Sequence, residues 1–282
     1  MRPINEEARR NVYDLRDAFC EVGKRVWQRE MVAANDGNFS FRLDANTVLA
    51  TPTGVSKGSL VRNDLVLMDL QGNQLPPQYG LNTRPGTSEI RLHLNAYRMR
   101  PDVRAVVHTH APHATAWALS GRTLPRGVLE EAELVIGTVP LVPYATTGSW
   151  EFARQINPWI AKHDCFLLSQ HGAVTFGADL FSAWYRMEVL ELCSKTLLMA
   201  EQTGRALPRF SAEEFERLHE KKKAWNIQDP REDLPYKDWA NDALPAPAPA
   251  PLNGVWPEPP APQLPKFTGD FPMVEDLPRF GR

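Results

Sequence analysis

Three histidines have the residue type and the spacing of a metal site. His108 and His110 stand two residues apart after the apolar run 105–107. Because alternate residues of a strand point to the same face, their imidazoles would project together. His171 follows a second apolar run, 165–168, and precedes a glycine, so it also lies at a predicted strand end. Three imidazoles with an open fourth position are typical of catalytic zinc, so we expect Zn²⁺ or another divalent metal here.

A carboxylate stands near these histidines in the predicted scheme. Glu89 falls in the first turn of a helix that the sequence predicts over 87–99. In that position it either compensates the helix dipole or lies beside the metal and transfers a proton. His93 follows four residues later on the same helix face, and we expect it to have a structural or supporting role.

Glycines and small hydroxyl residues gather in three loops, at 36–40, 51–54 and 86–89. Gly37 and Gly54 permit positive φ and a close approach of the backbone to a ligand. Hydroxyls and free N–H groups in front of a helix bind anions such as phosphate. Each loop taken alone is also explained as an ordinary turn, or as the N-cap of the helix that follows.

Predicted helices and strands alternate loosely along the chain and must hold these residues in place. Apolar residues at helical spacing predict helices, and short apolar runs bounded by turn residues predict strands. The predicted helices cover 5–30, 87–99, 111–119, 151–161, a long segment from 179 or 182 onward, and 212–224. The predicted strands cover 39–43, 47–51, 65–70, 105–107 and 165–168. The pattern predicts a mixed α/β domain over residues 1–229.

Composition excludes several classes of protein. The formal net charge of the 282-residue chain is -2, which gives no field to attract nucleic acid or an anionic membrane. No apolar stretch is long enough for a membrane span, and the charged N-terminus does not resemble a signal peptide. The three scattered cysteines form neither a disulfide framework nor a metal knuckle, so we expect a cytoplasmic protein.

Proline marks a second region. Of the 25 prolines, 13 lie between Pro230 and Pro278. No periodic pattern survives there, and the sequence ALPAPAPAP at 243–251 favours an extended polyproline conformation. We therefore expect residues 230–282 to form a proline-rich extension. Its tryptophans and phenylalanines predict that it packs, in part, on its own or a neighbouring subunit.

Six short motifs occur in one order: GNFS (37–40), TPTG (51–54), GTSE (86–89), HTH (108–110), PYATTGS (143–149) and QHG (170–172). This series resembles the class II aldolase/adducin family over roughly residues 8–205. The resemblance implies a three-layer α/β/α domain in a homotetramer, with active sites between subunits. It also implies Zn²⁺ on His108, His110 and His171.

The same resemblance assigns roles to the remaining candidates. The acid/base carboxylate of the family falls on Glu89. The residues that bind the substrate phosphate fall on Gly37, Asn38, Thr53, Gly54, Thr87 and Ser88. The implied reaction cleaves a ketose 1-phosphate into dihydroxyacetone phosphate and an aldehyde through a metal-stabilised enediolate. Epimerases of the family carry aspartate where this chain has Glu89, which favours aldolase chemistry.

One departure keeps other functions open. Leu129 falls where the sugar-phosphate aldolases of the family place a tyrosine that protonates the leaving alkoxide from a neighbouring subunit. Adjacent carboxylates that could replace it are Glu130, Glu131 and Glu133. A metal-dependent decarboxylase acting on a hydroxylated aromatic or keto acid is the alternative, because decarboxylation also leaves a carbanion. Lys57 or Arg91 reaching into the pocket would favour that alternative. A non-catalytic scaffold or binding protein is the third hypothesis.

Overall fold

Apolar residues alternate between the two faces of the strands, so the sheet carries a hydrophobic core on each side. In β4 (Ala105–Thr109), Ala105 and Val107 belong to one core cluster and Val106 to the other. Phe166 of β6 joins the cluster of Val106, while its neighbour Leu167 joins the opposite one. A sheet with both faces apolar must be covered on both sides, which dictates three layers.

The computed structural model describes residues 6–78, 81–225 and 227. Within them, seven strands form one sheet in the order β3-β2-β1-β4-β7-β6-β5. Neighbouring strands are antiparallel except β5 and β6, which are parallel. The strands are β1 (Asn38–Arg42), β2 (Thr47–Ala50), β3 (Val66–Asp69), β4 (Ala105–Thr109), β5 (Leu141–Val142), β6 (Cys165–Leu168) and β7 (Gly172–Gly177).

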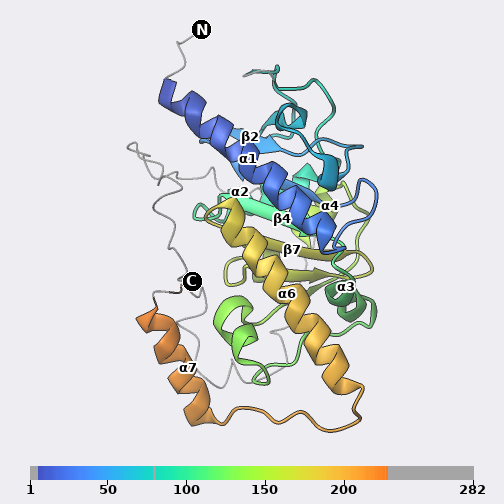
Figure 1. Ribbon diagram of the computed structural model, residues 1–282, viewed down its shortest axis with the longest axis vertical. Coiled ribbons are helices and arrows are strands. Elements are labelled where there is room, and N and C mark those ends of the chain that lie inside the picture. The colour runs from blue at the N-terminus through green and yellow to red at the C-terminus, as the bar shows by residue number, and fades with distance from the viewer. Residues whose placement is uncertain (1–5, 79–80, 226, 228–282) are drawn as a thin grey trace, which may run out of the picture.

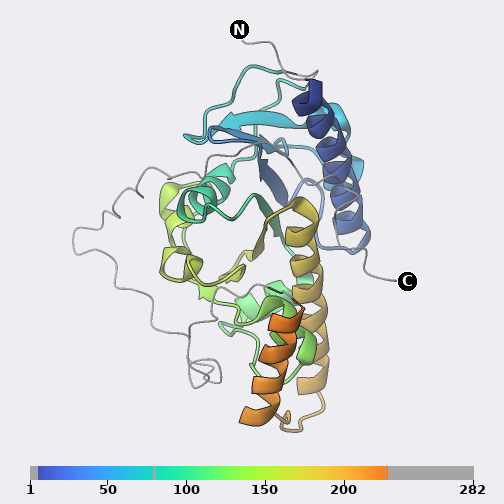
Figure 2. The same cartoon turned by 90° about the vertical axis from the view of Figure 1, so that its left-hand side faces the viewer.

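Helices cover both faces of this sheet (Figures 1 and 2). The core on one face includes residues of α1, α3 and α6, and the core on the other includes residues of α2, α4 and α5. The predicted three-layer α/β/α architecture is therefore confirmed. The helices are α1 (Glu6–Gln28), α2 (Ile90–Met99), α3 (Pro112–Leu119), α4 (Trp150–Arg154), α5 (Asn157–Ile160), α6 (Leu180–Glu201) and α7 (Ala212–Ala224), with short helical turns at Lys57–Ser59, Arg62–Asp64 and Ala132–Ile136.

The long helices match their predicted ranges because their caps and apolar stripes are local signals. In α6 the Asp179 side chain accepts a hydrogen bond from the backbone N–H of Ser182. In α7 Ser211 and Glu214 form a capping box. α7 packs against the turn Ala132–Ile136, where Lys222 Nζ donates to the backbone oxygen of Glu133 at 3.2 Å.

Three predictions about elements were wrong in detail. The helix predicted over 151–161 is two helices, α4 and α5, and Pro158 lies in the first turn of the second. A proline has no N–H to donate, so it favours a helix start over a helix interior. β7 was not predicted as a strand, although it joins β4 to β6 at the centre of the sheet. α2 begins at Ile90, so the helix predicted from residue 87 starts later.

The proline-rich extension predicted over 230–282 lies outside the described residues. The domain boundary at residue 229 therefore stays a prediction. The part of the chain that the structure describes contains no helix of the length and apolarity that a membrane crossing requires.

Candidate functional site

The three predicted histidines come together at one end of the inner strands of the sheet. His108 lies in β4, His110 follows the last residue of that strand, and His171 lies in the turn between β6 and β7. Because β4 pairs antiparallel with β7, the end of β4 lies beside this turn. The ring centroids are 4.6 to 5.2 Å apart. One ligand atom from each histidine lies within 4.8 Å of the others, and no other such group of three or more His, Cys, Asp or Glu occurs among the described residues.

The histidines present nitrogens that suit a divalent metal. His108 Nδ1 lies 2.9 Å from the backbone oxygen of Ala173, so Nδ1 carries a proton and Nε2 is the nitrogen left for a metal. His108 Nε2 and His171 Nδ1 are buried and make no hydrogen bond to any described residue. Buried polar atoms without partners are rare in folded proteins. Two of the three imidazoles carry such an atom, and the cluster of three fits a divalent metal.

Gly172 permits this close arrangement. A Cβ atom at residue 172 would lie 2.5 Å from the backbone oxygen of Thr109 and 3.0 Å from the His110 ring. Any side chain there would push β7 away from the end of β4 and separate His171 from His108 and His110. The glycine after His171 is therefore a steric requirement of the cluster.

Glu89 lies directly against two of the histidines. Its Oε2 is 3.2 Å from His108 Nε2, and its Oε1 is 3.2 Å from His171 Nε2. Burial acts to raise the Glu89 pKa, but His108, His171 and the Asn38 amide outweigh it and hold that pKa well below its ordinary value. Glu89 is therefore a carboxylate at neutral pH, placed to take up a proton beside the histidines.

The start of α2 differs from the sequence prediction in a way that serves Glu89. Glu89 occupies the position before the first helical residue, and its side chain caps no backbone group. The Thr87 hydroxyl accepts a hydrogen bond from the Glu89 backbone N–H at 3.3 Å. Thr87 thus stabilises the turn in front of the helix. The Glu89 carboxylate is not used for capping, so it can contact the histidines.

A buried chain of hydrogen bonds holds Glu89 from behind. Asn38 Nδ2 donates to Glu89 Oε2 at 2.7 Å, and His93 Nε2 lies 2.6 Å from Asn38 Oδ1. His93 Nδ1 lies 2.7 Å from Ser40 Oγ, which lies 2.6 Å from the Tyr97 hydroxyl. Burial lowers the pKa of His93 to about 3, so its ring is neutral. Since His93 Nε2–H donates to the Asn38 oxygen, its Nδ1 accepts the proton of the Ser40 hydroxyl. In this series of hydrogen bonds, each donor therefore points toward Glu89.

This chain gives His93 the supporting role that its helical position predicts. Ser40 and Tyr97 were not predicted for the site. Their spacing held a signal: Tyr97 is four residues after His93 on α2, and Ser40 is two residues after Asn38 on β1. Residues at these spacings share a face of a helix or a strand.

The loops predicted to bind phosphate converge near Glu89. Pro52 forms an isolated bridge with Gly86, the Thr53 backbone N–H donates to the Pro85 oxygen, and Thr87 N–H donates to the Thr51 oxygen. The third loop reaches the same place through the Asn38–Glu89 hydrogen bond. Thr53, Gly54 and Ser88 are exposed, whereas Thr87, Gly37 and Asn38 are buried. Gly54 has a φ of +72°, and a Cβ there would have nothing within 4 Å.

The two basic residues that would favour a carboxylate substrate are both engaged elsewhere. Lys57 is 2% exposed, and its Nζ donates to the backbone oxygens of Asn35 and Val55 at 2.9 and 2.7 Å. Arg91 is exposed on α2 and donates to the backbone oxygen of Gly148. Neither contact directs a free cation at the three histidines.

The segment that carries Leu129 is fixed by ion pairs. Leu129 is partly buried and packs against the core. Of the three adjacent carboxylates, Glu133 is buried in a bidentate pair with Arg126, and Glu130 pairs with Lys221. Glu131 is exposed. Of the three candidates for the missing tyrosine, Glu131 alone has no such pair in the described structure.

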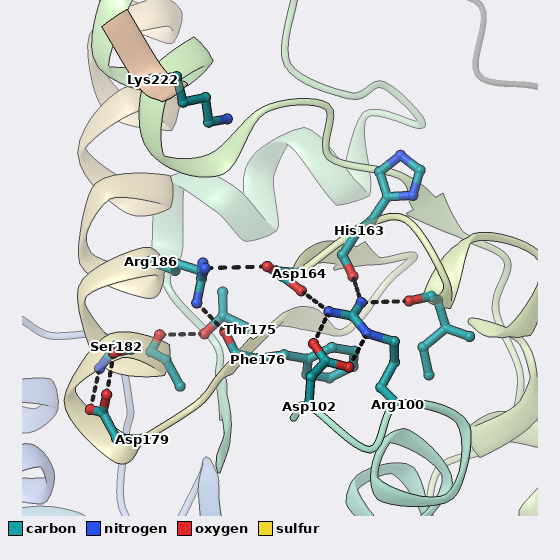
Figure 3. A network of polar contacts seen from close by, with 12 residues as sticks. Arg100, Asp102, His163, Asp164, Thr175, Phe176, Asp179, Ser182, Arg186 and Lys222 are labelled. Carbon is teal, nitrogen blue, oxygen red and sulfur yellow. Dashed lines mark hydrogen bonds and ion pairs between the residues drawn. The ribbon is translucent and has the colours of Figure 1, made fainter. Parts of the chain in front are cut away.

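A second polar cluster lies at the opposite ends of the same strands (Figure 3). Arg100 and Asp102 precede β4, and Asp164 directly precedes β6. Arg100 donates to Asp102 at 2.6 and 2.8 Å, to Asp164 at 3.0 Å and to the backbone oxygen of Ile160 at 2.9 Å. Arg186 of α6 lies 3.2 Å from Asp164 and donates to the oxygen of Phe176. Each charge of this cluster has a partner of opposite sign within the cluster.

Comparison with known proteins agrees with the motif series. A family model described as the Class II Aldolase and Adducin N-terminal domain matches residues 17–198, a span that contains the three histidines and Glu89. The chain is similar to a solved structure of L-fuculose 1-phosphate aldolase, with a TM-score of 0.66 and 28% identity, covering 74% of this chain and 96% of that one. The resemblance to sugar-phosphate aldolases of this family is therefore confirmed.

Two curated relatives differ in the reaction that they carry out. An L-fuculose phosphate aldolase of Methanococcus maripaludis is 36% identical over 173 residues, which is 61% of this chain and 90% of the relative. A 3-oxo-tetronate 4-phosphate decarboxylase of Haemophilus influenzae is 31% identical over 184 residues, which is 64% of this chain and 85% of the relative. Both matches cover most of the relative, so each is similar to this chain along nearly its whole length.

Proposed function

Because the chain belongs to the class II aldolase/adducin family, and is an enzyme of the lyase type, we propose that it cleaves a ketose 1-phosphate into dihydroxyacetone phosphate and an aldehyde. The observation that carries this proposal is the contact of one carboxylate with two of three clustered histidines. Glu89 lies 3.2 Å from both His108 and His171. A proton-transferring group and a set of metal ligands are thus parts of one site.

His108, His110 and His171 would hold the metal, and Zn²⁺ is the ion that we propose. Three imidazoles that leave a position open are the ligand set of catalytic zinc. When bound, such an ion supplies Lewis-acid stabilisation for negative charge that develops on substrate oxygens. The donor set fits this assignment, since it contains buried nitrogens without hydrogen-bond partners among the described residues.

Glu89 performs the proton transfer in this proposal. As a carboxylate it accepts a proton from the substrate carbon in the condensation direction, and as the acid so formed it returns that proton to the same carbon in cleavage. Asn38 fixes Oε2 of this carboxylate from one side. His93 and Ser40 behind Asn38 keep the amide from rotating, so the carboxylate is oriented before the substrate arrives.

The phosphate of the substrate binds, in this proposal, where the three loops converge. The proposed residues are Gly37, Asn38, Thr53, Gly54, Thr87 and Ser88. Asn38 uses one N–H for Glu89, and a primary amide has a second. The other two loops contribute the hydroxyls of Thr53 and Ser88, which are exposed. Hydroxyls and backbone N–H groups ahead of α2 suit a phosphate dianion.

The homotetramer implied by the resemblance is part of the proposal. Cleavage of a ketose phosphate requires a group that takes the proton of the hydroxyl that becomes the aldehyde carbonyl, and Leu129 has no such group. We propose that Glu131 of a neighbouring subunit supplies it, because Glu130 and Glu133 are held in ion pairs with Lys221 and Arg126.

Decarboxylation of a phosphorylated 3-oxo acid is the second candidate function. One observation favours it: the 31% identical relative of Haemophilus influenzae is a decarboxylase whose named substrate carries a phosphate. Loss of CO₂ leaves a carbanion next to a carbonyl but releases no aldehyde, so no hydroxyl proton has to be removed and this reaction needs no residue in the place of Leu129. The same three histidines, Glu89 and phosphate loops would serve it.

The deciding experiment offers both substrate classes to the protein, with and without a chelator. We expect release of dihydroxyacetone phosphate from a panel of ketose 1-phosphates, and loss of that activity on chelation. Release of CO₂ from 3-oxo acid 4-phosphates, without cleavage of the ketoses, would establish the second function instead. Failure of purified protein to bind metal would exclude both and leave the scaffold hypothesis.

A further inference from the structure

His110 differs from the other two histidines in what holds it. His108 lies inside β4 and is anchored through Nδ1 to the Ala173 backbone oxygen. His171 is fixed by its turn, where its backbone N–H donates to the Leu168 oxygen at 3.0 Å. His110 lies beyond the last residue of β4, and its side chain is 31% exposed. A ligand outside the strand needs another anchor if the three rings are to keep one geometry.

The register of the sheet places a carboxylate at that position. In the antiparallel pair β1–β4, Asn38 lies opposite His108 and Phe39 opposite Val107. Continued two residues past Asn38, this register sets Asp36 opposite His110. Side chains of directly opposed residues lie close enough to contact each other. The Asp36 Oδ2 atom is indeed 3.3 Å from His110 Nδ1.

The turn that carries Asp36 is held tightly against β4. Gly37 has a φ of +72°, and a Cβ there would lie 2.6 Å from Val32 Cγ1 and 3.0 Å from the backbone oxygen of His108. The Asp36 backbone N–H donates to the Ala33 oxygen at 2.8 Å. Buried Lys57 donates to the Asn35 oxygen at 2.9 Å. The Asp36 carboxylate is thus presented to His110 by a fixed backbone.

Asp36 and Glu89 approach the histidines from different sides. Glu89 contacts the Nε2 atoms of His108 and His171 at 3.2 Å each. Asp36 contacts the Nδ1 atom of His110, and it is not a member of the group of candidate ligands. Its side chain makes no other hydrogen bond or ion pair that involves a described residue.

We propose that Asp36 is a positioning residue for the metal site: its carboxylate accepts the Nδ1–H of His110 and holds Nε2 of that ring toward His108 and His171. The inference rests on the proposed function, because it requires the three histidines to bind a metal. A carboxylate on the far nitrogen fixes the tautomer of a ligating histidine and raises its basicity. In His108 the backbone oxygen of Ala173 accepts the Nδ1–H in the same way and fixes the ring.

The test measures Zn²⁺ affinity by competition with a chromophoric chelator, in the absence of substrate. Asp36→Ala removes the acceptor, and we expect the affinity to fall roughly 10- to 100-fold. Asp36→Asn keeps an oxygen at the same place but loses the charge, so we expect a smaller loss. Asp44→Asn is the matched control, since Asp44 follows the other end of β1 and its carboxylate accepts only from the backbone of its own turn. We expect its affinity to equal that of the wild type.

Two further measurements separate the possible failures. His110→Ala must lose affinity if the proposed metal site exists, so wild-type binding by that variant, or no binding by the wild type, overturns the proposed function and this inference together. Loss of binding by His110→Ala with wild-type affinity in Asp36→Ala overturns this inference alone. Thermal unfolding of the metal-free proteins completes the set, because a role limited to the turn would lower the midpoint of Asp36→Ala and leave its Zn²⁺ affinity unchanged.

Discussion

At one end of β4 and β6, Arg100, Asp102 and Asp164 bind one another and the neighbouring backbone (Figure 3). At the other end of the same strands, His108 and His171 each bury a nitrogen without a hydrogen bond to any described residue. Both clusters are polar, partly buried and held by the same sheet. The difference is that the first contains its own counter-charges, whereas the second gathers three histidines and a carboxylate that suit a divalent metal. Buried polar atoms without hydrogen-bond partners among the described residues, rather than polarity alone, distinguish the candidate metal site from the structural cluster.

Replacement of a histidine at each end gives the largest expected contrast. His108→Ala removes a metal ligand, and because Lewis-acid stabilisation amounts to several kcal/mol, we expect activity to fall about 1,000-fold or more. His163 lies at the opposite end, where its Nδ1 contacts the Trp159 oxygen at 2.9 Å. His163→Ala should keep its activity below its unfolding temperature. Steady-state turnover and metal content of both variants test this, and equal activities would contradict the comparison.

Carboxylate-to-amide exchange at each end is the second test. Glu89→Gln keeps the shape of the side chain and removes the proton acceptor, so we expect kcat to fall about 10²- to 10⁴-fold while Zn²⁺ stays bound. Asp164→Asn removes a charge between Arg100 and Arg186, and we expect it to lower stability and leave kcat unchanged. Kinetics with metal analysis, and urea unfolding, separate the two effects. Near-normal turnover in metal-loaded Glu89→Gln would refute the proton-transfer role.

Arg100→Met probes the charge balance of the second cluster directly. The Arg100 side chain is 11% exposed, and its removal leaves Asp164 with Arg186 as its remaining ion-pair partner. Because Asp164 then loses one of its two cationic partners and the backbone oxygens of Ile160 and His163 lose their donor, we expect the free energy of unfolding to fall by about 3 kcal/mol. Arg62→Met is the control, since its pair with Asp17 is exposed and screened by solvent, so we expect little loss of stability. Chemical denaturation measures both, and equal losses would remove the distinction.

The site residues that could be predicted from the sequence are those with local signals. His108, His110 and His171 each end an apolar run, and Glu89 starts a periodic helix. Those patterns place the residues at strand and helix ends before any pairing is known. The helices α1 and α6 were predicted from their apolar residues at helical spacing, whereas α7 was predicted as a strongly charged helix over 212–224.

What could not be predicted depends on strand pairing. β7 runs Gly-Ala-Val-Thr-Phe-Gly with both faces buried, so it lacks the polar alternation that marks a strand. Asp36 reads as a turn residue until the β1–β4 register sets it opposite His110. Ser40 likewise joins the site through His93, which is 53 residues away in the chain. Such contacts are decided by tertiary register, which short-range patterns do not contain.

Lys57 is a buried charge next to the turn that carries Asp36. Its Nζ donates to backbone oxygens and not to a carboxylate, so among the described residues its charge has no ion-pair partner of the kind found in the Arg100 cluster. Burial lowers its pKa to about 8 from 10.5, and nearby Asp36 opposes the shift only in part. Between these values the unfolded chain binds more protons than the folded protein, so stability rises with pH. Relative to Lys57→Met, the wild type should gain about 1 kcal/mol between pH 7 and pH 9.

Urea unfolding at pH 7, 8 and 9 checks this expectation, with Lys195→Met on the exposed side of α6 as the control that should show no such difference. The gain should be absent between pH 6 and pH 7, because both states are then fully protonated. A difference between wild type and Lys57→Met that stays constant from pH 7 to pH 9 would mean that Asp36 fully neutralises the buried lysine. In that case Lys57 and Asp36 would compensate each other's charge, as Arg100 and its carboxylates do. The difference between the two ends of the strands would then be confined to the three histidines and Glu89.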